Sequence, residues 1–165
     1  MRTDPYEKPF PAFLFDTDKS KWRYVIQAGL VSLLPSLAIA TLLQASGILT
    51  ESNGPEFKGH PIALLVGIVI ISPALETLLM GLIFFVLRRF IKHPIKLAVT
   101  SAVLWAALHS LAAPAWGLAV LWPFYVFSCA YIAWREKSWM TAYSITCCIH
   151  MFQNILPGIA AATMQ

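Results

Sequence analysis

The feature that most constrains this chain is a run of apolar residues from about residue 62 to 87. Its length matches the roughly 20 residues that a helix needs to cross the hydrocarbon core of a bilayer. The run contains one charged residue, Glu76. A charge near the centre of such a helix costs roughly 2.5–3.5 kcal/mol for groups such as Asp, Lys and Arg. The run therefore predicts a membrane-spanning helix whose Glu76 meets polar partners from elsewhere in the chain.

Composition excludes an ordinary soluble domain. Of the 165 residues, 58% are hydrophobic and 12% are charged, and the mean hydropathy is +0.68. Several apolar runs have the length of a membrane span. The formal charge of +4 does not indicate nucleic acid, because the basic residues flank the apolar runs and form no patch with interleaved aromatics. We predict an integral membrane protein whose surroundings are the lipid bilayer.

We predict an all-α bundle of about five transmembrane helices that encloses an active site. Residues 1–21 mix prolines, aromatics and charges, which favours a cytoplasmic or interfacial leader. Residues 22–165 form a single transmembrane domain, and its first span is too long for a cleavable signal peptide. Pro157 and Gly158 are expected to end or kink the last span. The expected spans are about 22–43, 62–87, 95–111, 116–134 and 139–156.

Basic residues predict the orientation of these spans. They cluster before the first span, in residues 88–96 and in residues 135–137, whereas the alternate loops hold only Lys58. Cytoplasmic loops carry the excess of Lys and Arg. We therefore expect a multi-pass protein of a bacterial or archaeal cytoplasmic membrane, with a cytoplasmic amino terminus and an external carboxyl terminus.

Three ionisable residues on three predicted spans share one depth. Glu76, His109 and His150 each lie 12 or 13 residues from the basic residues at the cytoplasmic ends of their helices. At a rise of about 1.5 Å per residue, all three sit roughly 18–20 Å from that side. Polar groups within a membrane normally face one another or a water-filled cavity. We expect these three side chains to form one site.

The last span carries a polar stripe. His150 and Asn154 are four residues apart and share one helix face, and Thr146 and Tyr143 extend that face toward the amino terminus. Gln153 breaks the pattern, and no role for it follows from the spacing.

A carboxylate, two imidazoles and an amide in a partly wet apolar pocket favour hydrolysis. Together they can deprotonate a water molecule and stabilise the oxyanion that forms when it attacks a carbonyl. Trp105 precedes His109 by four residues, so its indole is expected to pack over or beside that imidazole.

Other chemistries remain open on the residues alone. Ser72 and Ser110 lie near candidate site residues, but neither has a nucleophile-elbow pattern. The three cysteines lie within predicted spans and suggest no disulfide framework. A zinc site formed by Glu76, His109 and His150 ranks second, because the usual His-Glu-x-x-His helix is absent.

Three motifs resemble those of the CPBP intramembrane proteases, which include CAAX prenyl endopeptidases and bacteriocin-processing enzymes. Residues 73–77 match the start of Pro-x-x-Glu-Glu-x-x-x-Arg. Residues 105–109 match Phe-x-x-x-His with Trp in place of Phe, and residues 150–154 match His-x-x-x-Asn without change. The resemblance covers about residues 62–156.

The resemblance implies a metal-independent glutamic protease. In it, Glu76 with His109 would activate the hydrolytic water, and His150 with Asn154 would bind the oxyanion, with support from Trp105 and Thr77. No cofactor is expected. The chain departs from the family pattern where Thr77 replaces the second Glu and Gly81 replaces the Arg, which weakens the match around the glutamate.

The expected function is intramembrane endopeptidase activity. The expected substrate is a membrane-anchored or lipid-modified peptide or protein, and the reaction is the processing of a terminal sorting or prenyl-type signal. Two further alternatives are a catalytically silent relative that acts as a scaffold or immunity protein, and a proton or solute pathway. No nucleic-acid partner is expected.

Overall fold

A computed structural model describes residues 10–50 and 52–163, so most of the predicted leader, residues 1–9, lies outside the described residues. The described residues form helices and no strand, which confirms the all-α fold class. The helices are the 3₁₀ helix η1 (Ala12–Phe15), α1 (Lys21–Ala45), α2 (Pro61–Val66), the π-helical η2 (Gly67–Ile71), α3 (Ser72–Leu87), α4 (Pro94–Ala112), α5 (Trp116–Trp134) and α6 (Trp139–Thr163).

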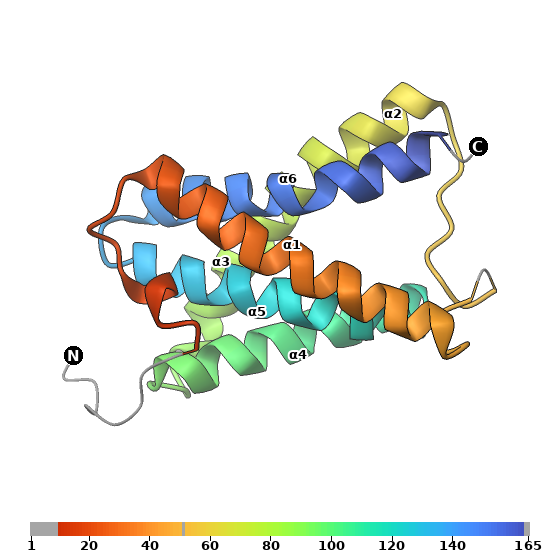
Figure 1. Cartoon of the computed structure of the whole chain (residues 1–165). Helices are drawn as coiled ribbons and strands as arrows, with labels where there is room; N and C mark the ends of the chain where they lie inside the picture. The colour runs from red at the N-terminus through yellow and green to blue at the C-terminus, as the bar shows by residue number, and fades with distance from the viewer. Residues whose placement is uncertain (1–9, 51, 164–165) are drawn as a thin grey trace.

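Five helical segments are long and apolar enough to cross a membrane. One of them is formed by α2, η2 and α3 in direct succession, from Pro61 to Leu87. The start of α1 and the end of α6 lie at opposite ends of the bundle (Figure 1). This arrangement is that of a multi-pass integral membrane protein with an odd number of crossings in the described residues.

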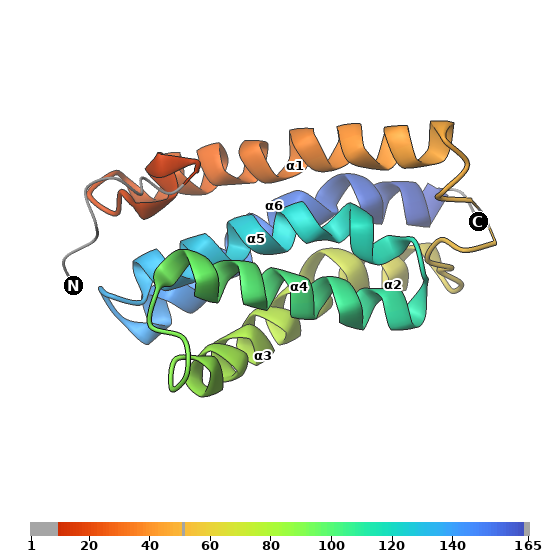
Figure 2. The same ribbon diagram turned by 90° about the horizontal axis from the view of Figure 1, so that it is seen from below.

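Helix α5 occupies the centre of the bundle. It packs against α1, α4 and α6, and its second half is almost entirely buried (Figure 2). Lipid tails are as apolar as leucine, so close packing and polar contacts, not the hydrophobic effect, hold membrane helices together. At Gly117 a Cβ atom would overlap the Ala106 carbonyl, so glycine permits close approach of α4 and α5. A buried hydrogen bond of 3.0 Å from Ser128 to Ser101 joins the same two helices.

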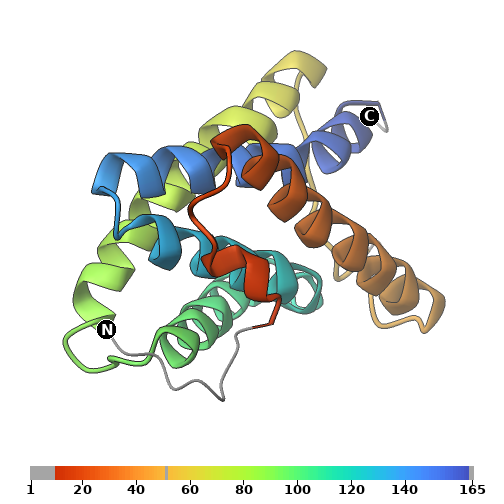
Figure 3. The same ribbon diagram turned by 60° about the vertical axis from the view of Figure 1, so that its left-hand side comes forward.

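Residues 10–20 fold back over one end of the bundle, where η1 contacts α5 (Figure 3). Leu14 is fully buried, and its carbonyl accepts a hydrogen bond of 2.7 Å from the Tyr24 hydroxyl. The Phe10 carbonyl accepts one of 2.8 Å from Tyr125. This part of the leader is therefore attached to the helices.

The π-helical turn has a direct cause in the sequence. The Ser72 N–H bonds to the Gly67 carbonyl, five residues back, and the next residue, Pro73, has no N–H to offer the Ile68 carbonyl. The side-chain amide of Asn154 donates to that carbonyl at 3.0 Å. Helix α6 thus supplies the hydrogen bond that proline removes from the α2–α3 span.

Helix α6 does not end at Pro157, and it continues to Thr163. Proline is tolerated inside membrane helices when neighbouring helices support the backbone. Gly158 is buried, and a Cβ there would meet the Val69 side chain, so the helix packs tightly against η2 directly after the proline. This contact, which the sequence does not reveal, explains why the helix continues past Pro157.

Gln153 connects α6 to α1. Its side-chain oxygen accepts a hydrogen bond of 2.7 Å from Ser32, and its nitrogen donates one of 2.7 Å to Ser36. All three side chains are buried. The residue that breaks the polar stripe of α6 therefore holds the first span against the site helix.

We expect Gln153→Leu to lower the free energy of unfolding by about 1–2 kcal/mol, because both serine hydroxyls lose a buried partner. The measurement is unfolding in mixed detergent micelles titrated with SDS. Gln44→Leu, at an exposed position of the same polarity, serves as the control. Equal stability of the two variants would contradict the role of this network.

Candidate active site

The structure brings Glu76, His109 and His150 together from α3, α4 and α6. The Nε2 atom of His109 lies 4.0 Å from Oε2 of Glu76, and Nε2 of His150 lies 3.8 Å from the same oxygen. The sequence predicted that the three residues share one depth, and in the structure both histidines face the same carboxylate oxygen of Glu76. Both distances exceed a direct hydrogen bond, and they are short enough for one water beside the groups to bridge them.

A serine one turn earlier positions the carboxylate. The Ser72 hydroxyl donates a hydrogen bond to Oε1 of Glu76. The other oxygen, Oε2, is buried and has no hydrogen-bond partner within the described part of the chain. Sequence reasoning considered Ser72 only as a nucleophile, although its spacing of four residues from Glu76 was a usable signal. Ser72 holds one oxygen and leaves the other to face the histidines.

The tautomer of neutral His109 follows from its neighbours. Its Nδ1 lies 2.8 Å from the carbonyl oxygen of Trp105. A carbonyl only accepts, so Nδ1 carries the proton and Nε2 presents a lone pair toward Glu76. The ring is held by Trp116, whose ring centroid is 4.7 Å away, and by Phe124 at 5.0 Å. His109 is therefore oriented to accept a proton on the side of the carboxylate.

His150 is the most deeply buried of the three groups, with 4% of its side chain exposed against 11% for His109 and 22% for Glu76. Its ring stacks on Phe127 at 4.4 Å between centroids and meets the edge of Phe124. These aromatic contacts fix the ring, and its Nε2 faces Glu76.

The polar stripe of α6 faces the α2–α3 span as a whole. Besides the bond from Asn154 to Ile68, the Tyr143 hydroxyl donates to the Ala74 carbonyl at 3.3 Å. Asn154 has two amide N–H groups, and Ile68 uses one of them. Asn154 lies in the cavity wall, so at most one N–H remains for a substrate oxygen.

The three groups line one cavity of about 220 Å³. It extends from Glu76 toward the end of the bundle opposite the basic loops, where Pro55 and Phe57 of the α1–α2 loop contribute to its wall. Phe57 meets Trp116 edge to face at 5.9 Å. The cavity is mainly apolar, and its polar groups are concentrated around the carboxylate.

The two supporting residues differ in their placement. The Trp105 indole lies beside the His109 ring at 6.0 Å, as expected, and stacks on Phe124 at 4.7 Å. Thr77 is fully buried, but it does not line the cavity, and its hydroxyl has no partner among residues 10–50 and 52–163. Trp105 packs against His109, and neither Trp105 nor Thr77 lines the cavity.

Whether a zinc ion fits this site depends on the distances between the three donor atoms. Ligands at about 2.0–2.2 Å from a tetrahedral zinc lie about 3.3–3.6 Å from one another. The Glu76 oxygen is 3.8 and 4.0 Å from the two histidine nitrogens. Across the described ranges, no three His, Cys, Asp or Glu side chains form a group that could hold a metal ion. As placed, the three donors lie slightly farther apart than the ligands of a bound zinc ion, and zinc stays the second alternative for this site.

Comparison with known protein families, with curated proteins and with solved structures finds no match to this chain. The function is therefore inferred from the geometry of the site.

Proposed function

We propose that this protein is an intramembrane glutamic-type endopeptidase in which Glu76 and His109 activate a water molecule. The observation that carries the proposal is a pair of hydrogen-bond acceptors, one on Glu76 and one on His109. Oε2 of Glu76 has no hydrogen-bond partner among the described residues, and Nε2 of His109 presents a lone pair 4.0 Å away. Two hydrogen bonds of about 2.8 Å that meet at roughly 90° span this distance, so one water can donate to both atoms.

A water held in this way has its remaining lone pairs free for attack on a carbonyl carbon. As it attacks, one proton passes to Glu76 or His109, and that group later protonates the leaving nitrogen. The negative charge develops on the carbonyl oxygen and needs hydrogen-bond donors. His150 and the remaining N–H of Asn154 lie on the same cavity wall and are the proposed donors.

The substrate we propose is a peptide bond in a membrane-anchored or lipid-modified chain. The supporting observation is the location of the cavity, which lies inside a bundle of membrane-spanning helices and has a mainly apolar wall. A substrate that already lies in the bilayer reaches such a cavity without crossing water. The three-motif resemblance supports the same class of substrate.

The test is a comparison of peptide termini in membrane fractions of cells that carry the wild-type protein or Glu76→Gln at equal expression. We expect a set of new termini in wild-type membranes that is lost in the variant, because the glutamine cannot accept a proton from water. Mass spectrometry of terminal peptides measures this and identifies the substrate.

Glu56→Gln is the matched control, because Glu56 is exposed and forms a surface ion pair with Lys58 at 2.7 Å. Its termini should equal those of the wild type. Termini that persist in Glu76→Gln would refute the proposal and favour a scaffold role. Loss of the termini on chelation with EDTA, and their return with zinc, would instead favour the metal-dependent alternative.

A further inference from the structure

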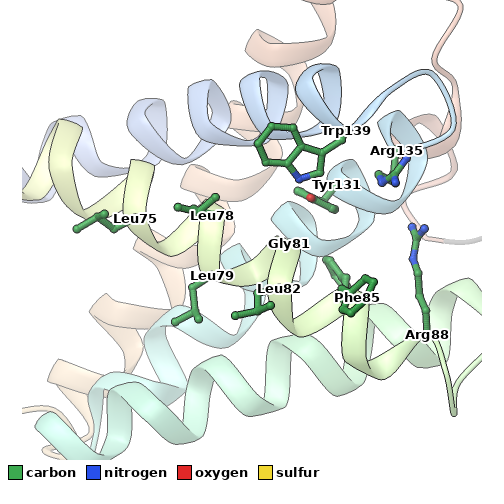
Figure 4. Close-up of a pocket in the computed structure, with 11 residues that line it drawn as sticks. Leu75, Leu78, Leu79, Gly81, Leu82, Phe85, Arg88, Tyr131, Arg135 and Trp139 are labelled. Atoms are coloured by element: carbon green, nitrogen blue, oxygen red, sulfur yellow. The ribbon is translucent and has the colours of Figure 1, made fainter.

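A groove on the outer surface of α3 lies apart from the candidate active site. It runs along the part of α3 between Leu75 and Arg88 and has a volume of about 640 Å³. Figure 4 shows its residues, with α3 on one side and the ends of α5 and α6 on the other. Its apolar wall includes Leu75, Leu78, Leu79, Leu82 and Phe85. Several of these side chains are half exposed or more, so the groove faces the lipid phase.

Two arginines close one end of this groove. Arg88 follows the last residue of α3, and Arg135 follows the last residue of α5. Arg88 extends its guanidinium group toward that of Arg135 at this end of the bundle (Figure 4). Neither forms an ion pair with a carboxylate in the part of the chain that the structure describes. Burial and the neighbouring Arg135 lower the pKa of Arg88, an effect that the attraction of Glu136 partly offsets.

A second cavity meets the groove at the same arginines. It has a volume of about 710 Å³ and lies beside the α3–α4 and α5–α6 loops, where Lys92 and Glu136 contribute to its wall. Arg88 and Arg135 are the two residues that line both cavities. The apolar groove along α3 and the cavity that contains Lys92 and Glu136 are therefore joined through a pair of cations.

Polar side-chain atoms also lie one helical turn before Arg135. Tyr131 precedes Arg135 by four residues, which corresponds to about 6 Å along the helix. Its hydroxyl and the indole nitrogen of Trp139 lie 2.5 and 3.7 Å from the position of a Cβ on Gly81. Because Gly81 has no side chain, these groups approach the groove closely. The region between phosphate and hydrocarbon is of comparable thickness, about 5–7 Å on each side of a bilayer.

We propose that the groove binds one anionic glycerophospholipid, with its phosphate between Arg88 and Arg135 and an acyl chain along the leucines of α3. The charge complementarity is direct, since guanidinium groups bind phosphate oxygens through paired N–H donors. The Tyr131 hydroxyl, which accepts a hydrogen bond from the Trp139 indole, is then placed to donate to an ester oxygen. The lipid comes from the leaflet at the basic end of the bundle, and its binding does not depend on the proposed peptidase activity.

The test is native mass spectrometry of the full chain after reconstitution with equal amounts of phosphatidylglycerol and phosphatidylcholine that carry identical acyl chains. We expect the wild-type protein to retain one phosphatidylglycerol through detergent removal. Arg88→Gln with Arg135→Gln should reduce that retention at least tenfold. Lys21→Gln with Arg23→Gln is the matched control, because it removes the same charge from exposed positions at the same end of the bundle, and it should retain the lipid.

Three results would overturn the proposal. One is equal retention of phosphatidylcholine, another is an equal loss in the control, and the third is a second copy of the chain bound in place of lipid. Thermal unfolding in detergent verifies that the double variant is folded. If it is not, Arg135→Gln alone replaces it, since Arg135 is exposed, and this variant should lower retention several-fold. Wild-type retention in a folded Arg135→Gln variant would also contradict the site.

Discussion

Replacing His109 with alanine is expected to lower the rate of substrate cleavage by about 10²–10⁴-fold, the usual contribution of a general base. The reason is the fixed tautomer. With Nδ1 donating to the Trp105 carbonyl, Nε2 is the lone-pair nitrogen that faces Glu76. The measurement is the initial rate of cleavage of the identified substrate in detergent or proteoliposomes.

Added imidazole separates a chemical role of His109 from a structural one. The alanine variant leaves a space between Trp116 and Phe124 that an imidazole molecule can enter. We expect it to restore part of the rate in His109→Ala and to leave the wild type unchanged. His60→Ala, at an exposed position before α2, should retain full activity. Full activity in His109→Ala, or a loss that imidazole does not restore, would count against the proposed role.

Arginine at position 81 is expected to abolish folding, although the resemblance places an arginine there. A Cβ on Gly81 would lie 2.5 Å from the Tyr131 hydroxyl oxygen, which is too close unless the Tyr131 side chain moves or α3 and α5 separate. We expect Gly81→Arg to yield little folded protein. Gly81→Ala should lower the free energy of unfolding by about 1–3 kcal/mol, the usual cost of overpacking. SDS titration of the purified variants measures both effects.

Tyr131→Phe provides the internal check on this prediction. It removes the oxygen nearest to position 81, so the second change should recover part of the stability lost in Gly81→Ala. Gly67→Ala is the control, because a Cβ at Gly67 has no atom within 4 Å among the described residues. A normally stable Gly81→Arg variant would contradict this prediction. The absence of an arginine at position 81 would then need another explanation.

Periodicity and charge were sufficient to predict the spans and to select the site. The apolar runs predicted five helices, and the common depth of Glu76, His109 and His150 predicted their convergence before any contact was known. Both arguments use only the 1.5 Å rise of a helix and the cost of an unpaired charge in lipid. These quantities depend on the position of a residue along its helix and not on its neighbours, so the sequence contains them.

The contacts that orient the site depend on which helices touch, and they were not predicted. The bond from Ser72 to Glu76 is local and was within reach of the spacing rule. The bond from Asn154 to the Ile68 carbonyl was not, because it needs both the missing N–H of Pro73 and the packing of α6 on η2. Gln153 was likewise uninterpretable until α1 was placed beside α6.

The π-helical turn also determines the direction in which the active-site carboxylate faces. A π turn accommodates one more residue than an α turn in the same length of helix, and one residue corresponds to about 100° of rotation. Every side chain from Ser72 to Leu87 therefore points about a quarter-turn or more away from the direction that an uninterrupted α-helix from Pro61 would give it. The facing of Glu76 toward His109 and His150 is thus a property of residue count along the backbone. A regular α-helix with all five of these residues kept would turn the carboxylate away, whereas loss of one residue between Gly67 and Ile71 would convert the π turn to an α turn and leave Glu76 facing the histidines.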